Sequence, residues 1–145
     1  MKSTEEAFLN YDDKQEEKRI HEIERFKKRG RILDVGASSG FFLKKIKERK
    51  NWVGYGIEYS KSGAKKAKKD GLSIRIGEIT NVSLPDNHFD VITMHSVLEH
   101  IPDLNLTINA VRKKLKRGGL LAFNVPNISS FEFLVYRLLR KSFAG

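Results

Sequence analysis

Short apolar runs alternate with lysine-rich helical segments along most of the chain, and this alternation constrains the fold more than any other feature. Five runs have the length of buried strands: RILDVG (31–36), WVGYGIE (52–58), GLSIRIG (71–77), DVITMHS (90–96) and LLAFNVP (120–126). Few polar residues interrupt them, as expected of strands covered on both faces. Strands that alternate with helices pair in parallel through right-handed crossovers. The sequence therefore predicts an α/β fold with an open, doubly wound, mostly parallel sheet.

The segments around these runs have helical patterns. Helices are expected over about 4–28, over about 39–49, over about 61–70 with Ser60 as N-cap, from Pro102 and Asp103 to about Arg117, and over 128–145. The fourth of these should stop at Gly118 and Gly119, because paired glycines commonly end a helix. The last is expected to be a closing amphipathic helix, since its apolar residues recur at helical spacing.

The charge balance is strongly basic, with a formal net charge of +10 over 145 residues. The lysines fall in three runs (43–50, 61–70 and 111–119) in which apolar residues recur at helical spacing. Such runs are typical of the solvated outer faces of helices, although an anionic partner such as nucleic acid stays open. The absence of cysteine excludes disulfides and thiolate-bound metals. No apolar run is long enough to span a membrane, so a cytoplasmic location is expected.

The ends of the strands are where a ligand is expected, because doubly wound sheets bind ligands beyond the carboxyl ends of their strands. Gly36 and Gly40 bracket the turn after the first strand and let the backbone turn sharply while a ligand approaches closely. Asp34 stands two residues ahead of the first glycine. A carboxylate there disfavours a pyrophosphate and favours a cationic ligand, such as a sulfonium amino acid with an ammonium group.

Acidic residues also follow the second and third strands. Glu58 ends the second strand, where an acid can accept hydrogen bonds from both hydroxyls of a ribose. Glu78 follows the third strand and could accept a hydrogen bond from an adenine amino group, while the N–H of Ile79 serves a ring nitrogen. Phe41, Tyr59 and Ile79 could supply apolar walls. These residues together predict a nucleoside-binding site beside the glycine turn.

Four segments in succession resemble the motifs of a known family: ILDVGASSGFFL, GYGIEYS, GEITNVSLPDNHFDVITMHSVLEHIPDL and LKRGGLLAFNVPN. They are similar to the class I S-adenosylmethionine-dependent methyltransferases, and closest to the branch that includes ubiquinone and menaquinone biosynthesis enzymes. The resemblance covers about residues 29–127, and the third segment is its most specific part. It implies a Rossmann-like sheet with strand order 3-2-1-4-5, and S-adenosylmethionine as the cofactor.

The resemblance also implies roles for individual residues. It assigns Asp34, Gly36 and Gly40 to the methionine end of the cofactor, Glu58 to the ribose, and Glu78 and Ile79 to adenine. His95 and Ser96 would line the cofactor near the reacting methyl group. Ala37, Ser38, Phe41 and Tyr59 are expected to be further cofactor-binding residues. Ser38 stands where a glycine is commoner, and Glu78 where aspartate is more usual.

His95 and Ser96, at the end of the fourth strand, bear on two questions: whether the chain has a general base and whether it binds a metal. His95 is the best-placed candidate for a general base if the acceptor is a hydroxyl. Metal-dependent relatives carry E-x-x-E-H after the fourth strand, whereas Ser96 stands here at the first of those acidic positions, so no metal site is predicted. Glu99 and His100 are then expected to start a helix and pack.

The expected function is methyl transfer to an oxygen, nitrogen or carbon atom of a small-molecule acceptor by in-line displacement. A non-catalytic binding subunit with the same fold is the alternative. A nucleic-acid methyltransferase is less favoured, because TMHS replaces the N-P-P-Y-like motif of base-amino methyltransferases. The chain reads as one domain (1–145), with an N-terminal helix (1–28), a cofactor-binding core (29–127) and the closing helix (128–145).

Relatives continue past the fifth strand with another helix and an antiparallel hairpin. The expectation is therefore a domain truncated at its C-terminus, in which the hairpin is missing and the fifth strand forms an edge. A missing segment or a second copy of the chain would then cover that edge.

Overall fold

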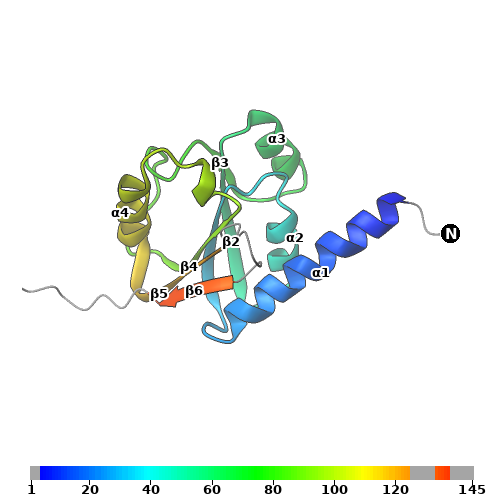
Figure 1. Cartoon of the computed structure of the whole chain (residues 1–145), viewed down its shortest axis with the longest axis horizontal. Helices are drawn as coiled ribbons and strands as arrows, with labels where there is room; N and C mark the ends of the chain where they lie inside the picture. Colours follow the sequence, from blue (N-terminus) through cyan, green and yellow to red (C-terminus); the bar gives the residue numbers. More distant parts are fainter. Residues whose placement is uncertain (1–3, 125–132, 138–145) are drawn as a thin grey trace, which may run out of the picture.

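A six-stranded sheet forms the centre of the molecule (Figure 1). The computed structural model describes residues 4–124 and 133–137, with side chains from 13 to 124. The strands are β1 (Gly30–Val35), β2 (Trp52–Glu58), β3 (Ile74–Ile76), β4 (Phe89–His95), β5 (Leu115–Asn124) and β6 (Phe133–Arg137). Their order in the sheet is β3-β2-β1-β4-β5-β6, and the first five are parallel. The predicted doubly wound sheet with order 3-2-1-4-5 is confirmed.

Helices cover both faces of the sheet (Figure 1). They are α1 (Thr4–Glu24), α2 (Phe41–Lys47), α3 (Lys61–Lys69) and α4 (Leu104–Lys114), with a short 3-10 turn at Leu98–His100. Helices α1, α2 and α3 share one hydrophobic core with the sheet, while α4 packs into the other. None of the helices within the described ranges is both long enough and apolar enough to cross a membrane.

The strands are apolar on both sides because each face of the sheet meets a different core. Ile32 of β1 packs into the core beneath α1, α2 and α3, whereas its neighbour Leu33 packs into the core beneath α4. Leu120 and Leu121 of β5 divide in the same way. Full burial of one such side chain contributes about 1.5–3 kcal/mol, so these runs contribute strongly to the stability of the fold.

Helix α4 ends earlier than its sequence pattern predicts. The expected helix to Arg117 is wrong, because α4 ends at Lys114 and β5 begins at Leu115. The N–H groups of Asn87 and His88 donate to the carbonyl oxygens of Lys113 and Lys114 at 2.8 and 2.9 Å. These bonds satisfy carbonyls at the end of the helix, and Leu115 then pairs with β4 as a buried strand residue.

The segment after β5 also departs from expectation. Residues Phe133–Arg137 form β6, antiparallel to Leu120–Asn124, so the closing amphipathic helix over 128–145 is wrong for these five residues. The rest of that range lies outside the described residues. The expectation that β5 forms an edge, to be covered by a missing segment or a second copy, is likewise wrong, because β6 pairs with it. Pairing satisfies backbone groups that an edge strand leaves open.

Candidate functional site

The carboxyl ends of β1 to β4 open into a cavity of about 710 Å³, which we call the strand-end cavity. Seven of the residues predicted from sequence line it: Gly36, Ser38, Glu58, Tyr59, Glu78, Ile79 and Ser96. Five others do not: Asp34, Ala37, Gly40, Phe41 and His95. The volume lies within the range of about 300–1,000 Å³ usual for small-molecule sites. The topology thus brings together side chains that are far apart in the sequence.

The turn after β1 passes close to neighbouring elements. Gly36 has a φ of 78°, and a Cβ at this position would overlap the side chain of Val97, which follows β4. Gly40 has a φ of 80° and directly precedes α2, and a Cβ there would overlap Leu72. Both glycines are therefore required by close approach as well as by backbone conformation.

Ser38 adopts a left-handed conformation, with a φ of 49°. This region costs a residue with a side chain about 1–2 kcal/mol, which accounts physically for the commoner glycine at this position. The N–H of Ser38 donates to one carboxylate oxygen of Glu58 at 2.6 Å. The strained backbone is thus held by a charge-assisted hydrogen bond.

Glu58 is fixed by backbone donors at the end of β2. Its second carboxylate oxygen accepts from the N–H of Ser60 at 2.7 Å, and Ser60 also caps α3 by accepting from the N–H of Gly63. A carboxylate held by two N–H groups has little rotational freedom and keeps lone pairs available for further donors. Tyr59, beside it, is 76% exposed at the rim of the cavity.

The turn after β3 presents Glu78 and Ile79 to the same cavity. The N–H of Glu78 donates to the side-chain oxygen of Asn81 at 3.0 Å, and the hydroxyl of Thr80 donates to the Glu78 carboxylate at 3.4 Å. Ile79 is buried and supplies an apolar wall. This region therefore offers a carboxylate beside an apolar surface, as the sequence predicts.

Asp34 lies beneath the turn, away from the cavity lining. It is only 4% exposed, accepts a hydrogen bond from the hydroxyl of Thr93 at 2.6 Å, and lies 3.5 Å from the guanidinium of Arg19. Burial raises the pKa of this carboxyl above its ordinary 3.8, while the Arg19 charge and the Thr93 hydrogen bond lower it. A direct contact between Asp34 and a ligand stays a prediction.

His95 is the last residue of β4, and the charge of Arg19 acts on it as well. Burial, and next the Arg19 charge, lower the pKa of His95 to about 2, so its imidazole is neutral at physiological pH. A group with so low a pKa accepts a proton poorly, because an effective base has a pKa near the working pH. The role of general base stays a prediction, and the geometry gives it no support.

The neighbouring Ser96 does reach the strand-end cavity. It has a φ of 51°, and its N–H donates to the side-chain oxygen of Asn124 at 2.7 Å. This bond ties the end of β4 to the end of β5. Within the described residues, no cluster of three His, Cys, Asp or Glu side chains could hold a metal ion.

One wall of the cavity was missed by sequence reasoning. The segment after β4 contributes Val97, His100, Ile101, Pro102, Asp103, Leu106 and Thr107. His100 faces the cavity, although packing was expected of it, and Asp103 caps α4 by accepting from the N–H of Leu106 at 2.8 Å. The position directly after β4, at the carboxyl edge of the sheet, was the signal that could have identified this wall.

The strand-end cavity is acidic although the protein is basic. Three carboxylates line it, those of Glu58, Glu78 and Asp103, and none of the described residues in its lining is a lysine or arginine. Apolar groups of Ile57, Ile79 and other residues form the rest of the walls. Such a cavity suits a ligand that carries positive charge, hydroxyl groups and an apolar ring.

Comparison with known proteins gives a consistent picture. The sequence matches the family model described as a methyltransferase domain over residues 8–143. It is 30% identical over 112 residues to an uncharacterized protein of Methanocaldococcus jannaschii, covering 77% of this chain and 52% of that protein. It is 31% identical over 111 residues to the ubiquinone biosynthesis O-methyltransferase of Alkalilimnicola ehrlichii, covering 72% and 44%.

Solved structures share the fold. A SAM-dependent methyltransferase of Thermotoga maritima aligns with a TM-score of 0.59 at 27% identity, covering 67% of this chain and 44% of that one. The chain spans about half the length of the curated relatives it matches.

Proposed function

The chain belongs to the methyltransferase-domain family, and from that premise we propose that it binds S-adenosylmethionine in the strand-end cavity and transfers the methyl group to a small molecule. The observation that supports this most is the acidic lining of the cavity in a protein of net charge +10. S-adenosylmethionine carries a sulfonium and an ammonium group, two ribose hydroxyls and an adenine ring. Carboxylates and apolar walls match each of these features, whereas a pyrophosphate would meet like charge.

The residues of the cavity have distinct proposed roles. Glu58, held by two backbone N–H groups, accepts from the ribose hydroxyls. Glu78 accepts from the adenine amino group, and Ile79 packs against the ring. Gly36 and Ser38 contact the methionine end, with Asp34 beneath them adding negative potential.

The remaining predicted residues support this arrangement. Gly40 and the start of α2 at Phe41 shape the turn, Ala37 packs under it, and His95 and Ser96 lie at the end of β4 towards the proposed site of transfer. Their contribution is to hold the turn and the end of β4 at a fixed separation.

The cofactor would supply a methyl group already activated on a sulfonium, which limits the chemistry that the protein must perform. The residues of this chain align the acceptor with that methyl group and exclude water from the cavity walls. Apolar side chains after β4, such as Val97 and Ile101, are suited to the second task. The low pKa of His95 favours an acceptor atom that is nucleophilic without losing a proton to a base of the protein.

Calorimetry with S-adenosylmethionine and the 145-residue chain tests the proposal. Glu58→Ala should weaken binding at least ~10-fold, because hydrogen bonds to a charged group contribute about 1.5–3 kcal/mol. Glu48→Ala is a matched control, since it removes an exposed carboxylate at the C-terminal end of α2, outside the cavity lining. Absence of binding by the unchanged chain, or equal binding by both variants, would contradict the proposal. Transfer of a labelled methyl group to candidate acceptors then separates an enzyme from a binding subunit.

A further inference from the structure

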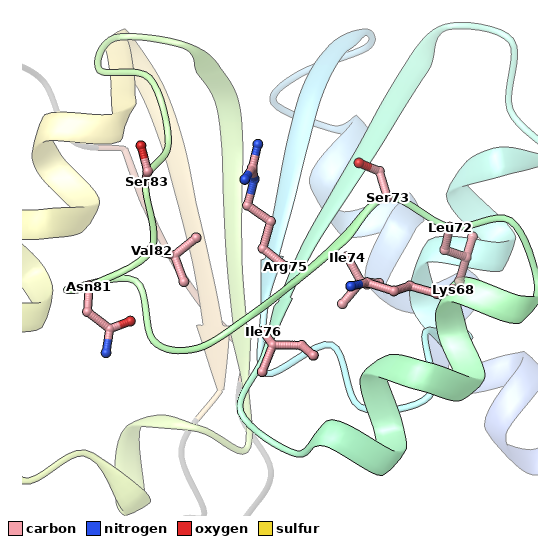
Figure 2. A pocket seen from close by; sticks show the side chains of 9 residues that line it. All are labelled: Lys68, Leu72, Ser73, Ile74, Arg75, Ile76, Asn81, Val82 and Ser83. Atoms are coloured by element: carbon pink, nitrogen blue, oxygen red, sulfur yellow. The ribbon is translucent and has the colours of Figure 1, made fainter.

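A second concave surface lies along the free edge of the sheet, and we call it the β3 groove (Figure 2). Its volume is about 620 Å³. It is lined by Lys68, Leu72, Ser73, Ile74, Arg75, Ile76, Asn81, Val82 and Ser83. Figure 2 shows the Arg75 side chain between β3 and the segment that carries Val82 and Ser83, with Lys68 on the opposite side.

The backbone of β3 is hydrogen-bonded on one side only. The N–H of Gly56 donates to the carbonyl of Ser73 at 2.8 Å, and the N–H of Gly77 donates to the carbonyl of Glu58 at 3.1 Å. Backbone groups alternate in direction along a strand, so those of the central residue, Arg75, also point to β2. The N–H and C=O groups of Ile74 and Ile76 therefore point outward, where no strand pairs with β3 in the part of the chain that the structure describes.

The side chains around this edge are basic. Lys68 and Arg75 line the groove, and no acidic residue is found in its lining over residues 4–124 and 133–137. Lys61, Lys65 and Lys69 gather beside Ile76 on the adjoining surface of α3. None of these five side chains makes an ion pair within the described residues. Their charge is thus available to an external anion.

The exposed surface of the groove is mainly polar, and no aromatic ring is among the described residues that line it. Leu72 and Ile74 are buried, Val82 is half-buried, and Ile76 is 45% exposed. Single-stranded nucleic acid is usually bound by basic grooves that also offer aromatic rings on which bases stack. An open strand edge flanked by two partly exposed apolar side chains, Ile76 and Val82, instead suits an extended peptide, whose backbone pairs with the edge while alternate side chains pack.

We propose that the β3 groove binds an extended acidic segment of a partner protein, which adds to the sheet as a strand beside β3. The backbone of that segment would pair with the outward groups of Ile74 and Ile76. Its acidic side chains would face Arg75 on one side of the sheet and Lys68 on the other, and its apolar side chains would pack beside Val82 and Ile76. The same lysines repel other copies of this basic chain, which protects the edge from self-association. This surface is independent of the proposed cofactor site, and its test needs no cofactor.

The first experiment uses a synthetic seven-residue peptide with blocked ends, Glu-Glu-Val-Val-Glu-Glu-Val, which as a strand presents glutamate on both faces. Amide hydrogen exchange of the 145-residue chain, followed by NMR, should slow at Ile74 and Ile76 when the peptide is added. Lys68→Glu combined with Arg75→Glu should weaken peptide binding at least ~10-fold. Arg112→Glu combined with Lys113→Glu, a matched change on exposed positions of α4, should leave it unaltered. The corresponding lysine–valine peptide should not bind.

A second variant tests strand addition itself. Ile76→Pro removes an N–H that points away from β2, a change that edge strands tolerate, so the fold should persist while peptide binding falls. Full binding by this variant would overturn the proposal. So would equal binding by both charge-reversal variants, protection confined to other strands, or tighter binding of a twenty-nucleotide oligouridine that is lost in the Lys68 and Arg75 variant. The last result would assign the surface to nucleic acid.

Discussion

Two concave surfaces of similar volume, about 710 and 620 Å³, adjoin at β3. Ile76 lines the β3 groove, and the next residue, Gly77, lines the strand-end cavity. In the part of the chain that the structure describes, the cavity lining has three carboxylates and no lysine or arginine, whereas the groove lining has a lysine and an arginine and no carboxylate. One short strand thus separates two ligand environments of opposite charge, and the net charge of +10 describes neither of them.

The two surfaces also differ in backbone conformation. Four residues that line the cavity, Gly36, Ser38, Gly77 and Ser96, have positive φ values, and none of those that line the groove does. Backbone held in sparsely populated regions commonly marks sites organised before the ligand arrives. An ordinary strand edge requires no such strain. The comparison predicts that the cavity is sensitive to small changes of backbone and the groove to changes of charge.

The largest effect is expected at Gly36. Gly36→Ala should lower the free energy of unfolding by about 3 kcal/mol, because a positive φ costs about 1 kcal/mol and the new methyl group must displace Val97. Gly118→Ala is the matched control, since Gly118 also has a positive φ but open space around it, and about 1 kcal/mol is expected. Urea unfolding of both variants measures the difference. Equal losses would show that close approach to Val97 does not constrain the turn.

The burial of His95 at the end of β4 should appear in the pH dependence of stability. His95 has a pKa of about 2 in the folded protein, against 6.5 ordinarily, so below pH 6.5 the unfolded chain binds a proton that the folded chain does not. Folded stability is therefore lost as pH falls from 6.5, by up to about 1.4 kcal/mol per pH unit. His95→Gln should flatten urea-unfolding stability between pH 6.5 and 4.5, a total change of about 2 kcal/mol. Parallel pH profiles for the two proteins would contradict this.

Removal of a single charge should change ligand binding at one surface and leave the other unchanged. Glu78→Gln is expected to weaken S-adenosylmethionine binding about tenfold and to leave the acidic peptide unaffected. Arg75→Gln should do the reverse. Calorimetry of both ligands against both variants gives four affinities. If either substitution changes both affinities alike, the two surfaces are not independent.

The smallest effect is expected at Ser38. Ser38→Gly should stabilise the fold by about 0.5 kcal/mol, because relief of the left-handed strain exceeds the added entropy of an unfolded glycine. Ser39→Gly, at a neighbouring position without a positive φ, should instead destabilise it slightly. Thermal unfolding resolves the sign of each change. Destabilisation by both would mean that the Ser38 side chain contributes more than its backbone costs.

The sheet was predictable from sequence because its strands are buried on both faces and alternate with helices. The parallel sheet and the location of the cavity both follow from that alternation, whereas the order of the strands was implied by the resemblance to the methyltransferases. Glu58 and Glu78 were predictable as residues of the cavity for the same reason, since each directly follows or ends a strand. Apolar periodicity and strand ends are local signals, and these features depend on nothing else.

Features set by distant contacts were not predictable. The end of α4 depends on N–H donors from Asn87 and His88, which lie before β4 in the sequence. The segment at Phe133–Arg137 has an apolar pattern that fits either a helix or a strand, and pairing with β5 decides between them. Asp34 is buried beneath the turn next to Arg19 of α1. Nothing in the sequence near the glycine turn indicates that α1 packs beside it.

The three-residue length of β3 has a consequence for the precision of the strand-end cavity. Hydrogen bonds at both ends, from Gly56 to Ser73 and from Gly77 to Glu58, hold the strand in one register against β2. A slip of one residue would turn Ile74 out of the core and carry Glu78 away from Glu58. Those main-chain bonds therefore fix the distance between the backbones of Glu58 and Glu78, from which the two carboxylates extend into the cavity.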